Sequence, residues 1–227
     1  MCWNKEVSLG SFIIISLVCI MLFKRNLPND RLMSIFIMGY GSMQLFETII
    51  WVGIEYNKPI INKIGTVLAS LLLYFHPLIF LLGLKYDKFY KNITKNSIYK
   101  IGFVIALLFI IIGVFRNGRA LFSKSPNYSL TSYLLPKYRH LVWDIPHNYN
   151  LIILFLIIAS LIFIFNKNKI FLILLLLYYM IPALYSYLSS PLYLNKNTAG
   201  SYWCWIVAFF SFLIYFTNPM LQKYNAN

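Results

Sequence analysis

The stretch Ile64–Leu84 reads IGTVLASLLLYFHPLIFLLGL and contains no Asp, Glu, Lys or Arg. A helix that crosses the hydrocarbon of a bilayer needs about 20 mostly apolar residues, and this stretch is long enough. Its apolar residues form a continuous run and do not alternate with polar ones, which excludes a strand of a transmembrane β-barrel. The stretch therefore predicts a transmembrane helix.

Six further stretches of the chain are interpreted in the same way. Together they predict an all-α integral membrane protein, a seven-transmembrane helix bundle that forms a single domain over residues 1–227. A long outer loop, residues 116–149, joins the fourth and fifth predicted helices. The additional predicted helices are Val7–Phe23, Leu32–Ile54, Ile98–Phe115, Asn150–Phe165, Ile170–Leu188 and Thr198–Phe216.

The composition supports a membrane protein. Of the 227 residues, 60% are hydrophobic and only 11% are charged, whereas an ordinary globular domain is about a quarter charged. A water-soluble domain of this size cannot bury so much apolar surface. The composition therefore excludes a soluble enzyme, a disordered tail and a small disulfide-rich secreted domain. Nucleic acid is not an expected partner, because no soluble domain is predicted to carry a basic face.

The distribution of basic residues predicts the orientation. The net charge is +14, and the lysines and arginines lie almost entirely between the predicted helices. With seven helices, the short loops and the C-terminal tail on one side hold eleven of them, against four on the other side. Because basic residues accumulate in cytoplasmic loops, we expect the N-terminus outside and the C-terminus inside, although the long loop adds five basic residues to the outer side. We expect anionic lipid headgroups as partners.

One carboxylate, Glu47, lies clearly within a predicted helix. Tyr40, Gln44, Glu47, Trp51 and Glu55 recur at spacings of three or four, which places them on one stripe of that helix. An intramembrane charge is costly, so such a residue faces the bundle interior. Two interpretations stay open: a proton, ion or metal site, and a protonated hydrogen-bonding link between helices.

Other polar features mark the predicted interior. Glycines and a serine beside the Glu47 stripe would let a neighbouring helix approach closely, namely Gly39, Gly41 and Ser42. His76 precedes Pro77 near the middle of its helix, and Pro182 interrupts the sixth predicted helix beside Tyr178 and Tyr185. Proline frees a backbone carbonyl and kinks a helix, so these positions are candidates for lining a ligand or ion pathway.

The long loop ends in YRHLVWDIPH, residues 138–147. His140, Asp144 and His147 are close in sequence, although Pro146 prevents one continuous helix through all three. Two interpretations remain for this segment. It is either an interfacial segment anchored by Trp143 and tyrosines, or part of a metal site that includes both histidines.

Several short motifs occur along the chain in this order: Met1-Cys-Trp3, Gln44-x-x-Glu47-x-x-x-Trp51, Pro77, His140-Leu-Val-Trp143, Pro146-His147 and Trp203-Cys204. Together they resemble a family of uncharacterised small multi-pass membrane proteins that begin Met-Cys-Trp. The resemblance implies that these positions matter, and it implies no activity. On the predicted topology the cysteines, histidines, tryptophans and Glu47 among them converge on the outer leaflet.

This convergence leaves three site chemistries open. Glu47, His140, His147 and Cys204 form a ligand set that suits Zn, Cu or Fe, with Glu47 and the histidines as catalytic groups. Alternatively, Cys2 pairs with Cys204 in a disulfide on an oxidising outer face. The third option is a ligand or ion pathway lined by Tyr40, Gln44, Trp51, His76, Tyr178, Tyr185 and Trp203.

The corresponding functions are a metal-assisted membrane enzyme that acts on a lipid-like substrate, a transporter or channel with a proton- or ion-active Glu47, and a structural viral or cellular membrane protein. Seven-helix zinc hydrolases such as ceramidases are an architectural analogy only, because their His-x-x-x-His spacing is absent. A retinal protein is not expected, since Thr198–Phe216 contains no lysine. The reaction, the small-molecule or ion ligand and the oligomeric state do not follow from the sequence.

Overall fold

The computed structural model describes residues 4–122, 130–135, 140–142 and 208–219. Within these ranges the protein is mostly helical, and four helices are long and apolar enough to cross a membrane. The elements are α1 (Lys5–Arg25), α2 (Asp30–Glu55), α3 (Pro59–Tyr86), the 3₁₀ helices η1 (Lys88–Tyr90) and η2 (Ile93–Lys95), α4 (Ser97–Phe122), β1 (Tyr133–Leu135), β2 (His140–Val142) and a helix through residues 208–219.

Local sequence signals explain where the helices begin and end. α1 starts after Asn4, whose side-chain oxygen accepts a hydrogen bond from the N–H of Val7 at 2.8 Å. It ends where Asn26 adopts a left-handed conformation with φ 55°, which asparagine tolerates better than most residues. α3 begins with Pro59, whose missing N–H is not needed in the first turn.

The first four predicted helices are confirmed as helices, and each is longer than predicted. The largest difference is in α4, which continues to Phe122, so the prediction that the long loop begins at residue 116 is wrong. Hydropathy falls at Arg116 and Asn117, but polarity alone does not end a helix. The side-chain amide of Asn117 donates to the carbonyl of Gly113, one turn earlier in the same helix, at 2.9 Å. The predicted helices 150–165 and 170–188 lie outside the described residues.

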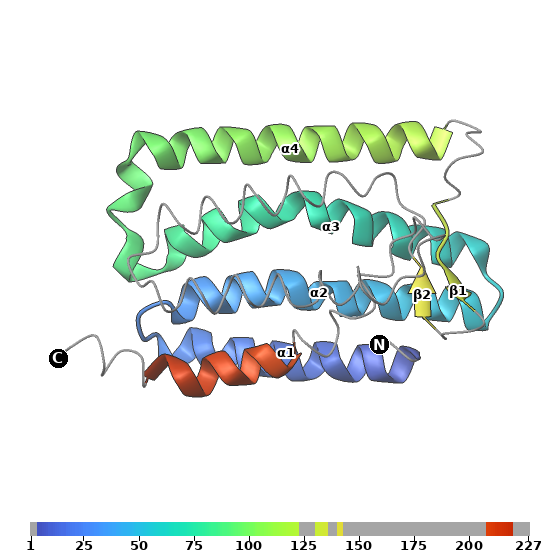
Figure 1. The fold of residues 1–227 in the computed structure, drawn as a ribbon, viewed down its shortest axis with the longest axis horizontal. Helices are drawn as coiled ribbons and strands as arrows, with labels where there is room; N and C mark the ends of the chain where they lie inside the picture. Colours follow the sequence, from blue (N-terminus) through green and yellow to red (C-terminus); the bar gives the residue numbers. More distant parts are fainter. Residues whose placement is uncertain (1–3, 123–129, 136–139, 143–207, 220–227) are drawn as a thin grey trace.

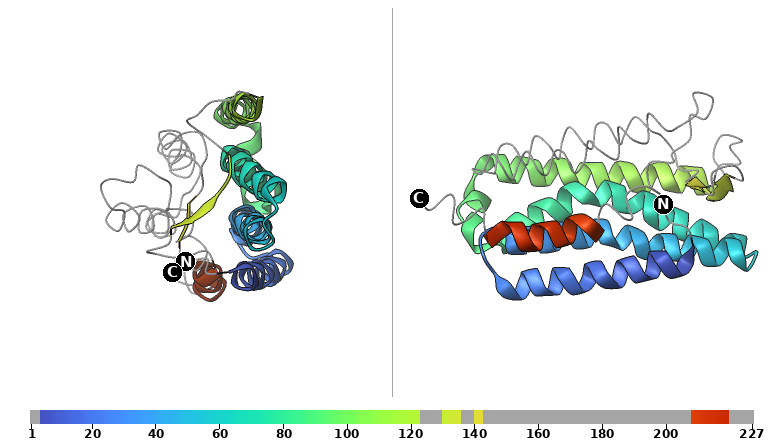
Figure 2. Two further views of the ribbon diagram at one scale, coloured as in Figure 1. Left: turned by 90° about the vertical axis from the view of Figure 1, so that its right-hand side faces the viewer. Right: turned by 60° about the horizontal axis from the view of Figure 1, so that its bottom comes forward.

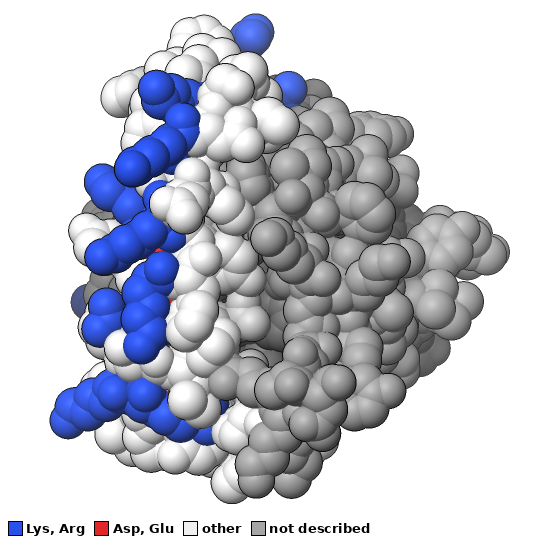
Figure 3. All heavy atoms as spheres, turned by 90° about the vertical axis from the view of Figure 1, so that its left-hand side faces the viewer, with Lys and Arg blue, Asp and Glu red and all other residues white. Residues whose placement is uncertain are grey.

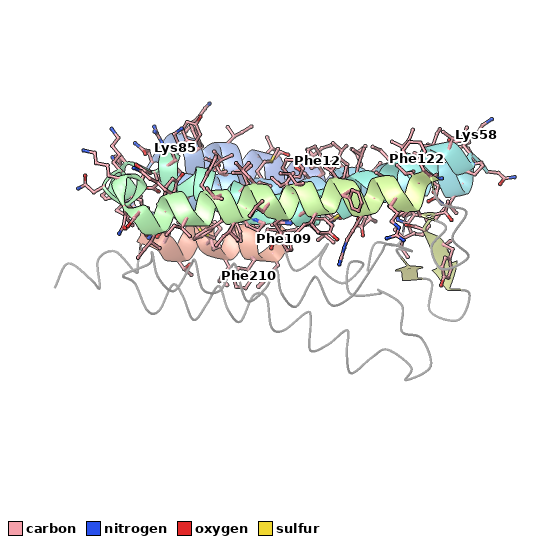
Figure 4. The ribbon with its side chains drawn as sticks, turned by 90° about the horizontal axis from the view of Figure 1, so that it is seen from above. Phe12, Lys58, Lys85, Phe109, Phe122 and Phe210 are labelled. Atoms are coloured by element: carbon pink, nitrogen blue, oxygen red, sulfur yellow. The ribbon has the colours of Figure 1, made fainter. Side chains whose placement is uncertain are left out.

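The four long helices lie side by side and are antiparallel to their neighbours (Figure 1). Seen end-on, they form a curved row in chain order, from α1 to α4 (Figure 2). The connections α1–α2 and α3–α4 lie at one end, here called the basic end, and the connection α2–α3 and the two strands lie at the other, the hairpin end. Lys85 and Lys58 mark these opposite ends (Figure 4).

Glycines allow the helices to approach closely. A Cβ atom built at Gly39 would lie 2.8 Å from the side chain of Ile79 in α3, and one at Gly41 would lie 2.5 Å from that of Ile15 in α1. This confirms the predicted close approach of neighbouring helices to this part of α2. At Gly53 the nearest atom belongs to the backbone of α3, because an added Cβ would lie 2.4 Å from the nitrogen of Asn62. Backbone-to-backbone packing therefore sets the spacing of α2 and α3 at the hairpin end.

A buried ion pair ties the helix through residues 208–219 to the basic end, where this helix lies beside α1 (Figure 1). Asp30, the first residue of α2, is fully buried and accepts two hydrogen bonds from the Arg25 guanidinium, both 2.8 Å long. The amide of Asn218 donates to the same carboxylate at 2.6 Å. Arg25 also donates to the carbonyl of Tyr215 at 2.6 Å. Asp30 thus joins α1, α2 and the last described helix.

The predicted long loop contains a short antiparallel β-sheet that sequence analysis did not predict; the rest of the described chain is mostly helical, as predicted. β1 pairs with β2 in a register that places Leu134 opposite Leu141. Each strand contains one residue of a type that favours strands, Tyr133 in β1 and Val142 in β2. Pairing of the strands gives hydrogen-bond partners to backbone N–H and C=O groups that an irregular chain would leave without partners. This is favourable for a segment that packs on apolar helices.

Candidate functional site

The predicted polar stripe of α2 faces the protein interior. Tyr40, Gln44, Glu47 and Trp51 are all buried, and no part of the Glu47 side chain reaches the surface. This confirms that the residues share one face. Glu55, the last member of the predicted stripe, is exposed at the end of α2, where it accepts a hydrogen bond from the Lys5 ammonium group at 2.5 Å. The candidate site therefore ends one turn before Glu55.

α3 contributes a buried histidine to the stripe. His76 is fully buried, and its ring lies against that of Tyr40 with 3.8 Å between the centroids and 31° between the planes. The next residue is Pro77, which lies inside α3 and lacks the N–H that would otherwise bond to the carbonyl of Leu73. The structure thus brings two predicted ligand-binding residues, Tyr40 and His76, into contact beside a proline within α3.

The hairpin, formed by β1 and β2, covers the part of α2 that carries Glu47 and the neighbouring part of α3. Leu141 of β2 is fully buried and packs in one cluster with Met43, Ile50 and Ala69. Met43 lies four residues before Glu47 and Ile50 three residues after it, so all three share one side of α2. β2, whose first residue is His140, is therefore within one helical turn of the Glu47 position along α2.

Asn62 near the start of α3 holds the hairpin in place. Its amide donates to the carbonyl of Ser132 at 2.8 Å, and its side-chain oxygen accepts from the N–H of Ser132 at 2.9 Å. The hydroxyl groups of Thr66 and Ser132 lie 2.8 Å apart. Sequence analysis missed these residues, because Asn62 lies just before the predicted helix start at Ile64. The spacing of Asn62 and Thr66, one helical turn apart, was the available signal.

Replacing Asn62 with Ala is expected to release the hairpin from α3. The change removes both hydrogen bonds to Ser132 and leaves its buried backbone groups without partners, which costs about 1–3 kcal/mol each. Hydrogen exchange at Leu134 and Leu141 should become faster than in the parent protein. Lys58→Ala, an exposed residue in the same connection, is the control and should leave the exchange unchanged. Unchanged protection in Asn62→Ala would contradict the anchoring role.

Other predicted site residues lie outside the described part of the chain: Cys2, His147, Tyr178, Tyr185, Trp203 and Cys204. For His140 the structure describes the backbone only. Among the described residues, no group of three His, Cys, Asp or Glu side chains could hold a metal ion. The metal set with Glu47, His140, His147 and Cys204, and the Cys2–Cys204 disulfide, therefore stay predictions. Cys19 is free and buried in α1.

Comparison with known proteins finds no protein-family model, no curated protein and no solved structure that matches the chain. The described residues alone therefore define the class of protein. It is a helical protein with four helices suited to crossing a membrane, and a buried polar stripe runs between two of them.

Proposed function

We propose that the chain is an integral membrane protein of seven transmembrane helices whose hairpin end faces outside and whose basic end faces inside. The basic residues support this orientation. Within the described ranges eight lie at the basic end and five at the hairpin end, and basic residues accumulate on the inner side of a membrane. The eight are Lys24, Arg25, Arg31, Lys85, Lys88, Lys91, Lys95 and Lys100, and the five are Lys5, Lys58, Lys63, Arg116 and Arg119.

We further propose that this protein is a membrane enzyme that acts on a lipid-like substrate, with Glu47 as its general acid or base. The observation that carries the proposal is the complete burial of Glu47 in a candidate membrane span, on a stripe with Gln44 and Trp51. A carboxyl group is costly at this depth and is typical of a functional site. An amphiphilic substrate can reach such a site from the bilayer without crossing water.

The hairpin adds a second set of groups to this proposal. β2 begins at His140, and its next residue packs with Met43 and Ile50 on both sides of Glu47 along α2. In the proposed enzyme, His140, His147 and Cys204 would hold a transition metal ion such as Zn, Cu or Fe, for which imidazole and thiolate are suitable ligands and which would act as a Lewis acid. Glu47 would transfer a proton to or from the substrate.

The test is conversion of lipids by the purified full-length protein. The protein is reconstituted in vesicles that contain phospholipids, sphingolipids and acylglycerols, and products are identified by mass spectrometry. Glu47→Gln should reduce product formation by at least about 100-fold, the usual contribution of a general acid or base. Glu6→Gln removes an exposed carboxylate from α1 and should keep full activity. Product formation that is equal in the Glu47→Gln and Glu6→Gln variants would overturn the proposal.

The contact between Tyr40 and His76 favours a second candidate function, a transporter or channel with a proton-active Glu47. The ring pair lies beside Pro77, where α3 lacks one backbone hydrogen bond, and Gln44 and Glu47 follow Tyr40 on the buried stripe of α2. Such a path would extend to Tyr178, Tyr185 and Trp203. In this case Glu47→Gln abolishes proton-coupled flux into liposomes, and the unmodified protein converts no lipid.

A further inference from the structure

The basic end carries a row of exposed lysines. Figure 3 shows them as a nearly continuous band across this end of the molecule, with almost no acidic surface beside them. We call these six residues the headgroup pad. Five belong to α3, α4 and the connection between them, and one lies at the end of α1. The pad consists of Lys24, Lys85, Lys88, Lys91, Lys95 and Lys100.

Acidic side chains at this end do not neutralise the pad. Within the described ranges, the carboxylates near it are Asp30 and Asp87, and both are buried. Asp30 is paired with Arg25, and none of the six lysines forms a salt bridge to a described residue. The positive potential of the pad is therefore directed outward without compensation from neighbouring carboxylates.

Asp87 holds the connection that carries the pad against the start of α2. Its carboxylate accepts hydrogen bonds from the N–H of Phe89 at 3.0 Å and from the N–H of Leu32 at 3.3 Å. The second bond caps α2, because Asn29 at the N-cap position makes no side-chain cap. Burial raises the pKa of Asp87, and the two backbone hydrogen bonds act in the opposite direction.

Tyr90 makes a second link between the pad and α2. Its hydroxyl donates to the side-chain oxygen of Asn29. Burial raises the pKa of the Tyr90 hydroxyl, which keeps it protonated as a donor. Asp87 and Tyr90 together hold η1 against α2, so Lys85, Lys88 and Lys91 extend from a fixed backbone.

Aromatic side chains border the pad at the level where the helices end. Phe89 and Tyr86 are both more than half exposed. The Lys88 ammonium lies 5.2 Å from the centroid of the Phe89 ring, which is within the reach of about 6 Å for a cation–π interaction. Exposed aromatic and basic residues together are typical of the membrane–water interface, where apolar rings meet the acyl region and cations meet phosphate groups. A soluble anion would not explain the exposed rings.

We propose that the headgroup pad binds the phosphate groups of anionic phospholipids in the leaflet at the basic end, and that Asp87 is a positioning residue for this surface. The proposal goes beyond the function proposed for Glu47 and does not depend on it. The pad and the candidate site lie at different levels of the bundle, so either proposal can be wrong while the other is right.

The test is lipid binding by the purified full-length protein in detergent, measured by native mass spectrometry. Phosphatidylserine, phosphatidylcholine and inorganic phosphate are titrated separately. We expect phosphatidylserine to bind most tightly and Lys91→Gln/Lys95→Gln to weaken it by about 30-fold, since each lysine near an anionic surface contributes about a five-fold effect. Lys58→Gln/Lys63→Gln, a matched pair at the hairpin end, should change the affinity less than about two-fold.

Two outcomes would overturn the lipid proposal. One is equal weakening by both double variants, and the other is binding of inorganic phosphate as tight as that of phosphatidylserine, which would indicate a site for free phosphate. Asp87→Ala tests the positioning role. Removal of a negative charge alone would tighten phosphatidylserine binding, whereas loss of positioning weakens it. Asp87→Asn keeps one acceptor oxygen and should restore part of the affinity. Tighter binding in Asp87→Ala would exclude the positioning role.

Discussion

Replacing Arg25 with Met is expected to destabilise the protein by about 3–5 kcal/mol, because it leaves the fully buried carboxylate of Asp30 without its charged partner. The change also removes the hydrogen bond from Arg25 to the carbonyl of Tyr215 and the contact of the guanidinium with the Tyr215 ring, 4.4 Å from its centroid. The measurement is the unfolding free energy or thermal midpoint of the purified protein in detergent.

The double variant Arg25→Met/Asp30→Asn separates charge from packing. It neutralises the carboxylate that the single variant leaves unpaired. An amide at position 30 keeps one of the two acceptor oxygens, which can serve either the N–H of Leu27 or the amide of Asn218. We therefore expect the double variant to be more stable than Arg25→Met alone. A double variant that is no more stable than the single one would show that packing of the arginine, and not the buried charge, is what matters.

Replacing Gly53 with Ala is expected to cost about 3 kcal/mol, at the upper end of the usual effect of overpacking. The added Cβ would lie 2.4 Å from the backbone nitrogen of Asn62 and 2.7 Å from its Cα. A flexible side chain could move aside, but these are backbone atoms at the start of α3. α2 and α3 would have to separate, and the displacement would reach the hydrogen bonds of Asn62 to Ser132.

Gly10→Ala is the matched control, because Gly10 also lies inside a long helix and an added Cβ there meets nothing within 4 Å. Alanine favours helix more than glycine does, so this variant should be stabilised by about 0.5–1 kcal/mol. The two glycine substitutions are thus expected to shift the thermal midpoint in opposite directions. Similar shifts for both would indicate that the close approach at Gly53 does not limit the spacing of α2 and α3.

The helical spans and the burial of the polar stripe could be predicted because both depend on patterns along one segment. Continuous apolar runs predicted the positions of α1 to α4, and the spacing of Tyr40, Gln44, Glu47 and Trp51 predicted one buried face. The helix ends were less predictable. α4 continues through Arg116 and Asn117 to Phe122, because a helix ends where its hydrogen bonds end, and hydropathy reports only which residues suit lipid.

The hairpin and its anchor could not be predicted, because they depend on residues far apart in the chain. Asn62 and Ser132 are 70 positions apart, and their hydrogen bonds exist only once α3 has placed its first turn beside β1. The same holds for Leu141, which packs with Met43 and Ala69. The sequence of the long loop indicated aromatic anchors, but it indicated neither the two strands nor the surface that they cover.

The sequence alone determined which segments are apolar enough to suit a membrane, and that Glu47 lies within one of these segments. Both follow from composition and periodicity, which control the transfer of a helix into lipid. The tertiary structure decided which polar groups meet. Asp30 is paired with Arg25 and Asn218. Asp87, in the connection between α3 and α4, caps the start of α2. Buried polar groups need hydrogen-bond partners. Which groups become partners depends on how the helices pack, because residues that are far apart in the sequence can be neighbours in the folded chain.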